Sequence, residues 1–414
     1  MKSFTIIVMD TMRLDEFNSI ESRLHGFEKL GADFIGNCIA PSAWTLPSHA
    51  SLFTGLYPGE HGSHESKYVK SFDISEIKLK KKTFVSDLNR MGFDTYAISA
   101  NPYVHPVYGF NEFKHFHEES YYTDVYGSAL EVSKKLKKFV EEHKSDRSAV
   151  GYRSFRDSIS DALRVLKAAS NDPPLLMELL ASGTVFSALS LLKKSKAKLQ
   201  GWPLEKGGRY IASRVRSTEM RKPFFMFINL MEAHDPYIGK KGLDLTWSTS
   251  FMRTKPDPEL LELWKRKYSK ASRMAYDYAL RISRHLLDKC GDQTIIITSD
   301  HGQAFNEQGF IGHGTMLYDS IVRIPMAVIG AKERGRKYNN GYASLVNVKR
   351  FLLSSVKGRT DLSLLYSKGV YSESFGIPAN IRAVEGINMS KVERYDRYRI
   401  RRFGARQDIE KVNA

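Results

Sequence analysis

The most informative stretch of the chain is Ala40-Pro41-Ser42-Ala43-Trp44-Thr45-Leu46-Pro47-Ser48-His49-Ala50-Ser51-Leu52-Phe53-Thr54-Gly55-Leu56-Tyr57-Pro58. Pro47 suits the first turn of a helix, where its missing N–H loses no partner, and Gly55 suits the helix exit. Thr45 then lies just ahead of free backbone N–H groups and the positive end of the helix dipole. That position attracts a phosphate or sulfate group. An ordinary capped helix would have the same pattern, because Thr is a common N-cap residue.

The composition is that of a soluble globular enzyme. The chain has 414 residues, 42% of them hydrophobic and 26% charged, which fits one large domain and a smaller one. Its two cysteines, Cys38 and Cys290, do not form a disulfide framework, and the apolar run after Met1 is too short for a signal peptide. We therefore expect a reducing compartment, the cytoplasm.

The chain is strongly basic, with 63 Lys and Arg against 46 Asp and Glu, a net charge of +17. Residues 131–222 hold 20 basic and 10 acidic residues, and residues 382–406 hold 8 basic and 3 acidic ones. This excess favours an anionic ester substrate or peripheral contact with an acidic membrane surface. Nucleic acid is not an expected partner, because the chain has no zinc-finger or RNP-type motif.

Short apolar segments alternate with helical patterns, which predicts a mostly parallel sheet covered by helices on both faces. The predicted strands are residues 4–9, 95–99, 224–229, 294–298 and 324–329. Polar residues follow three of these strands directly: Asp10, Glu232 to His234, and Asp300-His301. Because ligands bind beyond the carboxyl ends of parallel strands, we expect these side chains to form one site.

A long, basic helical insert is predicted at about residues 128–222. Within it, residues 173–192 are apolar and nearly long enough to span a membrane, but Glu178 and Gly183 argue against a span. One hypothesis is an interfacial helix resting on anionic lipid. The alternative is a lid, or a helix that packs in a homo-oligomer. The role of this insert stays open.

The predicted domain organisation is a catalytic α/β domain at residues 1–338, containing the insert, and a small α+β subdomain at residues 339–414. Residues 370–374 are expected to form a further strand. Residues 391–402 alternate charged with apolar or aromatic side chains in places, as edge strands do.

Two carboxylates, a hydroxyl and an imidazole make a plausible site for a divalent cation. The candidate ligands are Asp10, Thr45, Asp300 and His301. A cation that contacts Thr45 would lower the pKa of its hydroxyl and yield a nucleophile at neutral pH. His234 and His313 could contact the oxygens of the substrate or protonate the leaving group.

The order and context of these motifs resemble the sulfatase branch of the alkaline phosphatase superfamily, over roughly residues 3–115 and 223–330. The matching motifs are Val8-Met9-Asp10-Thr11, Thr45-x-Pro47-Ser48-His49, His234-Asp235-Pro236-Tyr237, Thr298-Ser299-Asp300-His301-Gly302 and Gly312-His313-Gly314. The resemblance implies an alkaline-phosphatase-like α/β sandwich and a covalent intermediate on the nucleophile. It implies that Asp10, Asp300 and His301 are metal ligands. It also implies that His234 and His313 bind the transferred group and assist the departure of the leaving group.

The departures from the sulfatase pattern are informative. Thr45 stands where sulfatases carry the cysteine that becomes formylglycine, and threonine cannot be converted in that way. Such a threonine resembles the phosphoesterases and phosphoglycerol transferases of the superfamily. His49 stands in place of the usual arginine, so it is a candidate catalytic residue without a fixed charge, and Thr11 stands where a second acidic residue is frequent.

We expect one divalent ion, with Mn, Zn or Mg favoured over Ca because His301 adds an imidazole to few carboxylates. A second metal is doubtful, since no Asp-x-x-x-His pattern occurs near His234.

Three functions are weighed. The leading hypothesis is a metal-dependent hydrolase that cleaves a phosphate or, less favoured, a sulfate ester through a covalent intermediate on Thr45. The second is a phosphoglycerol-type transferase that acts on a lipid or glycan acceptor at the membrane surface. The third is a non-catalytic anion-binding protein, which is disfavoured because Asp10, Thr45, Asp300 and His301 are all present.

Overall fold

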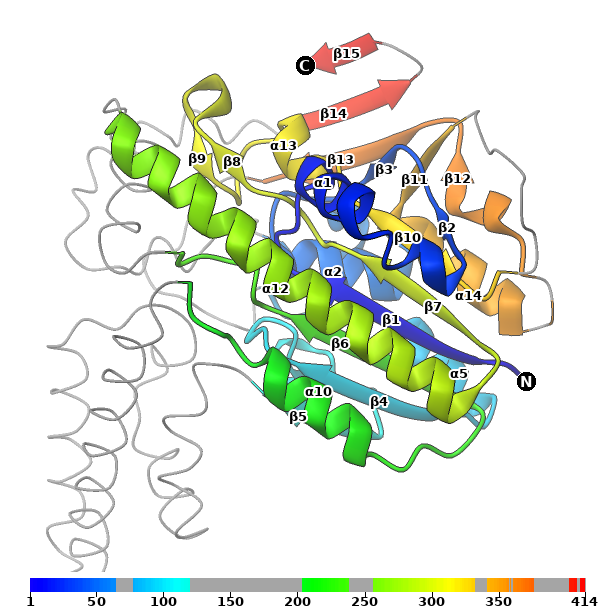
Figure 1. Cartoon of the computed structure of the whole chain (residues 1–414). Coiled ribbons are helices and arrows are strands. Elements are labelled where there is room, and N and C mark those ends of the chain that lie inside the picture. Colours follow the sequence, from blue (N-terminus) through cyan, green and yellow to red (C-terminus); the bar gives the residue numbers. More distant parts are fainter. Residues whose placement is uncertain are drawn as a thin grey trace, which may run out of the picture.

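The central sheet has the strand order β2-β10-β7-β1-β6-β4-β5 (Figure 1). The computed structural model describes residues 1–64, 77–119, 203–237, 256–331, 341–356, 358, 360–375, 402–407 and 410–413, the last two segments by their backbone alone. The strands of the sheet are β1 (Ser3–Met9), β2 (Ala32–Phe34), β4 (Asp94–Ser99), β5 (His115–Glu118), β6 (Phe224–Leu230), β7 (Gln293–Thr298) and β10 (Met326–Ile329).

All five strands predicted from the sequence belong to this sheet, and the expected α/β fold is confirmed. β7, β1, β6, β4 and β5 run parallel, but β10 runs antiparallel to both β7 and β2. The segment between β7 and β10 contains only short elements and no helix that crosses back along the sheet. β10 therefore starts near the edge where β7 ends and must run in the opposite direction.

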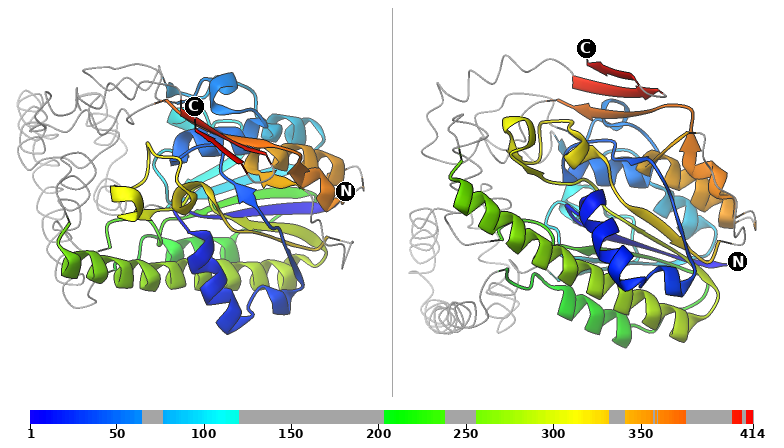
Figure 2. Two further views of the ribbon diagram at one scale, coloured as in Figure 1. Left: turned by 90° about the horizontal axis from the view of Figure 1, so that it is seen from above. Right: turned by 45° about the horizontal axis from the view of Figure 1, so that its top comes forward.

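Helices cover both faces of the sheet, as Figure 2 shows from above. One face carries α1 (Leu14–Leu24), α10 (Gly208–Ser217) and α12 (Pro258–Cys290), and the other carries α2 (Thr45–Thr54), α5 (Phe84–Arg90) and α14 (Val348–Val356). Side chains of β1 alternate between two apolar clusters: Ile7 and Met9 join the α12 side, and Ile6 and Val8 join the α2 side. Burial on both faces explains the unbroken apolar run in the sequence.

Helix α2 begins at Thr45, with Trp44 as its N-cap residue, so Pro47 is the third helical residue. The helix ends where the sequence predicts, at Gly55, whose φ of +72° lies in the left-handed region and whose N–H donates to Ser51 O. Every residue of α2 is buried. The helix therefore has little freedom to shift, and its first turn is held at the carboxyl edge of the sheet.

Smaller elements complete the fold. β3 (Cys38–Ile39), β11 (Tyr342–Ser344) and β12 (Tyr366–Ser367) form a second sheet; β13 (Val370–Ser374), β14 (Arg402–Gln407) and β15 (Glu410–Asn413) form a third; and β8 (Ala304–Phe305) pairs with β9 (Ile311–Gly312). Short helical turns are α3 (Pro58–His61), α13 (Asp319–Val322) and the 3-10 turns Glu28–Leu30, Pro106–Tyr108, Glu307–Gly309, Leu345–Asn347 and Leu362–Leu365.

The strand predicted at residues 370–374 is present as β13. The apolar segment 173–192 and residues 391–401 lie outside the described residues, as does most of the predicted insert. The domain boundary at residue 338 stays a prediction, although α14 packs against α2 and β11 pairs with β3. Among the described residues, no helix combines the length and the apolar character needed to cross a bilayer.

Candidate active site

Four segments bring polar side chains together at the carboxyl edge of the sheet. Asp10 follows β1, Asn101 lies just after β4, Asp300-His301 follows β7, and Thr45 starts α2. Asp10, Asp300 and His301 each offer a ligand atom, and these atoms lie within 4.8 Å of one another. The structure thus joins residues that are separated by almost 300 positions in the sequence, as the strand-end argument predicts.

In each of the two carboxylates, one oxygen accepts hydrogen bonds and the other accepts none. Asp10 Oδ2 accepts hydrogen bonds from Asn101 Nδ2 at 2.7 Å and Asn229 Nδ2 at 3.2 Å. Asp300 Oδ1 accepts from the backbone N–H groups of Thr11 at 3.2 Å and His301 at 2.9 Å. Asp10 Oδ1 and Asp300 Oδ2 are buried without a hydrogen-bond partner among the described residues. Buried, unpaired carboxylate oxygens are costly, so this pair fits a bound cation.

His301 completes the candidate ligand set in a defined orientation. Its Nδ1–H donates to Gly302 O at 2.9 Å, which leaves Nε2 with a free lone pair. That nitrogen lies 3.4 Å from Asp300 Oδ2 and 4.0 Å from Asp10 Oδ1. Burial lowers the pKa of His301 to about 4, so the ring is neutral at physiological pH and suited to coordinate a metal.

The pKa values of the two carboxyl groups are both raised. Burial raises the pKa of Asp10, and the charge of Asp300 raises it further. Burial also raises the pKa of Asp300. Two buried like charges destabilise each other unless a positive charge lies between them. The residues present therefore fit a divalent ion held by Asp10, Asp300 and His301.

Thr45 lies beside this group. Its Oγ1 is 3.5 Å from His301 Nε2 and 3.4 Å from Asn101 Nδ2, and the residue is only 3% exposed. Its position in the first turn of α2 places the hydroxyl at the positive end of the helix dipole. This arrangement suits an oxygen that carries negative charge during a reaction.

His49 lies one helical turn further along α2, behind the hydroxyl. Its Nδ1–H donates to Thr45 O at 2.9 Å and lies 3.6 Å from Asp300 Oδ2, while Nε2 is 3.4 Å from Asn229 Nδ2. The ring is fully buried. Through these contacts His49 connects helix α2 to Asn229 of β6 and to Asp300.

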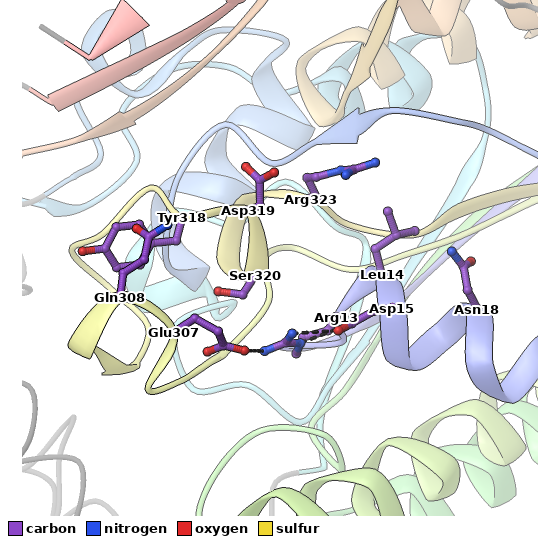
Figure 3. Close-up of a pocket in the computed structure, with 10 residues that line it drawn as sticks. All are labelled: Arg13, Leu14, Asp15, Asn18, Glu307, Gln308, Tyr318, Asp319, Ser320 and Arg323. Carbon is purple, nitrogen blue, oxygen red and sulfur yellow. Dashed lines mark hydrogen bonds and ion pairs between the residues drawn. The ribbon is translucent and has the colours of Figure 1, made fainter. Parts of the chain in front are cut away.

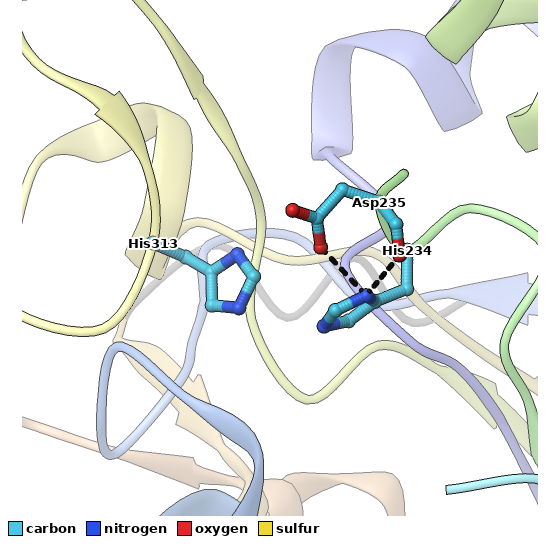
Figure 4. A group of neighbouring side chains, drawn as sticks. All are labelled: His234, Asp235 and His313. Atoms are coloured by element: carbon cyan, nitrogen blue, oxygen red, sulfur yellow. Dashed lines mark hydrogen bonds and ion pairs between the residues drawn. The ribbon is translucent and has the colours of Figure 1, made fainter. Parts of the chain in front are cut away.

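The rings of His234 and His313 lie near each other, as Figure 4 shows. Their ring centroids are 5.0 Å apart, and the His313 ring is 4.5 Å from the His301 ring. His234 Nδ1 contacts Asp235 Oδ1 at 2.8 Å. Burial, which lowers the pKa of His234, is outweighed by the charge and hydrogen bond of Asp235, which raise it to about 9.

His313 has the opposite electrostatic character. Burial lowers its pKa well below the usual value, and His301 and His234 lower it further. Its Nδ1–H donates to Gln303 Oε1 at 2.7 Å, so Nε2 holds the lone pair. His234 is therefore cationic near neutral pH and His313 is neutral. His234, Asp235 and His313 form a second group with ligand atoms within 4.8 Å, so the expectation of a single metal stays a prediction.

Thr11 connects the two halves of the site. It is a buried β-branched residue with a φ of +58°, in a region that such residues avoid. Its N–H donates to Asp300 Oδ1, and its Oγ1–H reaches Ala233 O at 2.6 Å and Asp10 O at 2.7 Å. The unusual backbone turn directs Asp10 toward Asp300 while holding the loop that carries His234.

A separate pocket of about 460 Å³ lies beside the β8–β9 hairpin (Figure 3). Arg13 lines it and donates to Asp15, to Glu307 and to the backbone oxygen of Gln303. The residues that line this pocket do not include the candidate metal ligands or Thr45. Through Gln303, Arg13 braces the segment that supports His313.

Several residues of this site are not evident from the sequence. Asn101 lies two positions after a predicted strand, and that position was a usable signal. Asn229 and Gln303 gave no local signal, because their importance depends on contacts made across the fold. Asp235 was part of a quoted motif, but its pairing with His234 depends on side-chain geometry that spacing does not show.

Comparison with known proteins supports the fold. No protein-family model matches the chain, and no curated protein matches it by sequence. Among solved structures, the phosphonate monoester hydrolase of Agrobacterium radiobacter matches with a TM-score of 0.55 and 13% identity, over 99% of this chain and 86% of that one. The 2-O GAG sulfatase BT1596 matches with a TM-score of 0.55 and 10% identity, over 91% and 78%. The chain therefore shares the fold of these two structures, which is the alkaline-phosphatase-like α/β fold that the motif resemblance implies.

Proposed function

We propose that this protein is a metal-dependent hydrolase of phosphate esters that uses Thr45 as its nucleophile. The observation that carries the proposal is the position of Thr45 Oγ1, 3.5 Å from His301 Nε2, a nitrogen that itself lies 3.4 Å from Asp300 Oδ2 and 4.0 Å from Asp10 Oδ1. Both named structural neighbours act on esters of tetrahedral anions, a phosphonate and a sulfate, which is consistent with such a substrate.

Asp10, Asp300 and His301 would hold the ion, together with the oxygen of Thr45. Bound there, a divalent cation supplies positive charge that lowers the pKa of a neighbouring hydroxyl and neutralises substrate oxygens. Mn, Zn or Mg suits two carboxylates and an imidazole better than Ca does. We also propose that the ion is one of these three and that the protein works in the cytoplasm.

The chain's own residues account for the remaining steps. Thr45 Oγ forms a bond to phosphorus as its proton leaves to solvent, and the bond from phosphorus to the ester oxygen breaks. His234, protonated and partly exposed, gives its proton to the departing oxygen. The N–H groups at the start of α2 and the amide of Asn101 face the developing charge. Water then cleaves the phosphothreonine, which restores Thr45 and releases phosphate.

The first test assays the purified protein on aryl phosphate, bis-aryl phosphate, phosphonate monoester and aryl sulfate, with EDTA or with added Mn, Zn, Mg or Ca. We expect metal-dependent cleavage of a phosphorus ester that is lost in Thr45→Ala. Adding glycerol as an acceptor distinguishes a transferase, because glycerol phosphate would then form at the expense of phosphate. Preferential sulfate cleavage, or no turnover with any of these compounds, would contradict the proposal.

A further inference from the structure

Lys206 is a buried lysine that the reaction scheme does not use. It is 2% exposed and lies just before α10. Its Nζ donates to Glu232 O at 3.0 Å and also to His234 O. A buried ammonium group is costly unless its N–H groups are satisfied, so these two carbonyls are its structural partners.

The loop that follows β6 is held through three consecutive carbonyl groups. Lys206 binds the first and third, which belong to Glu232 and His234. The middle carbonyl, Ala233 O, accepts from Thr11 Oγ1 at 2.6 Å and from Tyr237 Oη at 2.8 Å. Lys206 and Thr11, which belong to two other segments, and Tyr237, four residues after Ala233, thus fix the backbone of a loop that has no regular secondary structure of its own.

The loop after β6 also accepts hydrogen bonds from the backbone of the segment that carries Lys206. Glu232 Oε1 accepts the backbone N–H of Gly208 at 2.6 Å and that of Lys206 at 3.3 Å. A Cβ added to Gly208 would lie 2.6 Å from Glu232 Oε1 and 2.4 Å from the ring of Tyr278, so only glycine permits this approach. The segment that carries Lys206 and the loop that carries His234 therefore hold each other by hydrogen bonds in both directions.

These hydrogen bonds determine the direction in which the His234 ring points. With its carbonyl turned toward Lys206, His234 directs its ring toward His313, at a centroid separation of 5.0 Å. The ring's Nδ1 is engaged by Asp235, which leaves Nε2 for the substrate (Figure 4). The ring of Tyr237 lies 5.5 Å from Lys206 Nζ and closes the other side of the ammonium group.

We propose that Lys206 is a positioning residue that holds the loop Glu232–His234 by its carbonyls and so presents His234 to the leaving group. The proposal rests on the proposed function only in giving His234 the role of proton donor. Lys206 acts through the loop and does not touch the reacting atoms. A misplacement of about 1 Å is enough to cost on the order of 100-fold in rate, so a fixed loop matters for catalysis.

The kinetic test compares Lys206→Met with Lys2→Met. Lys2 is a matched control, because its side chain is 14% exposed and its Nζ donates to a backbone carbonyl, Gly330 O, at 2.7 Å, at the opposite edge of the sheet. In Lys206→Met we expect kcat to fall about 10- to 100-fold, most for aryl phosphates with poor leaving groups, with little change in KM. Lys2→Met should keep the kcat of the native protein.

A double variant shows whether Lys206 acts through His234. If it does, Lys206→Met combined with His234→Gln is no slower than His234→Gln alone. Losses that multiply, or a loss equal for all leaving groups, would overturn the proposal. Tyr237→Phe removes one donor from the same loop and should give the same pattern with a smaller loss, which keeps the test valid if Lys206→Met does not fold.

A spectroscopic measurement separates this proposal from the proposed function. The imidazole nitrogen NMR signals of His234, assigned with His234→Gln, should shift in Lys206→Met and in Tyr237→Phe but not in Lys2→Met. This readout needs no turnover. Shifted signals in a protein that cleaves none of the esters would reject the hydrolase and retain the positioning role. Unchanged His234 signals would reject the positioning role whatever the activity.

Discussion

Asp10 and Asp300 extend from the neighbouring strands β1 and β7, and each presents one buried carboxylate oxygen that has no hydrogen-bond partner in the described part of the chain. Burial raises the pKa of both groups, and the charge of Asp300 adds to the shift of Asp10. A protein does not gain stability from such a pair. The arrangement is therefore explained by what the pair can bind.

Metal binding should stabilise the fold, and Asp300→Asn should remove this effect. A ligand that binds only the folded state at 100 times its Kd adds about 2.7 kcal/mol to the free energy of unfolding. We expect Mn or Zn to raise the Tm of the native protein and to leave that of Asp300→Asn unchanged. Without metal, the variant should be at least as stable as the native protein, because one buried negative charge is gone. A metal-induced rise in its Tm would contradict this ligand assignment.

Substitutions of Thr45 test whether its hydroxyl group is the nucleophile. Thr45→Ala should lower kcat by about 10³-fold or more, because no oxygen remains to attack phosphorus. Thr45→Ser keeps the hydroxyl and should retain measurable turnover. Intact-protein mass spectrometry after acid quench should show a phosphorylated form of the native protein and none for Thr45→Ala. A phosphorylated alanine variant would place the intermediate on another residue.

The charge of Asp235 should set the alkaline limit of activity. His234 donates a proton only while it is charged, so activity falls as the pH rises through its pKa of about 9. In Asp235→Asn, burial still lowers the pKa of His234, but the charge that raises it is gone. The alkaline limb of the pH profile of kcat should therefore move to lower pH. An unmoved limb would assign it to a different group.

His61 should make the fold sensitive to acid. Its Nε2 lies 3.1 Å from Ser51 Oγ in α2, its Nδ1 accepts from the N–H of Ser63 at 3.0 Å, and burial lowers its pKa to about 3. The pKa of a histidine in the unfolded chain is about 6.5. Between pH 3 and pH 6.5, His61 is therefore protonated in the unfolded chain but not in the folded one. Stability should be fully present above pH 6.5 and fall below it, by up to about 1.4 kcal/mol per pH unit.

Urea unfolding of the native protein and of His61→Gln, at pH 7 and at pH 5, checks this prediction. His25→Gln is a suitable control, because that side chain is 53% exposed. The difference in stability between the two pH values should shrink in His61→Gln and not in His25→Gln. Equal pH dependence in all three proteins would show that His61 is not the group responsible.

Much of this architecture could be predicted from the sequence. A run such as Phe4 to Met9 is apolar at every position because both faces of its strand are buried, and that property is visible in the residues themselves. The residues that follow these strands, such as Asp10 and Asp300, then had to meet at one edge. Thr45 was found because Pro47 and Gly55 mark the helix it begins.

The sequence by itself determined five of the seven strands of the central sheet, helix α2 and the residues at the strand ends, since these depend on periodicity and on neighbours within a few positions. The tertiary structure decided the direction of β10, the pairing of Asn101 with Asp10 across 91 positions, and the hold of Lys206 on the His234 loop. Such hydrogen bonds depend on distances and angles between segments that only folding brings together. A local sequence pattern does not specify those distances, so only the folded chain shows which side chains support the site.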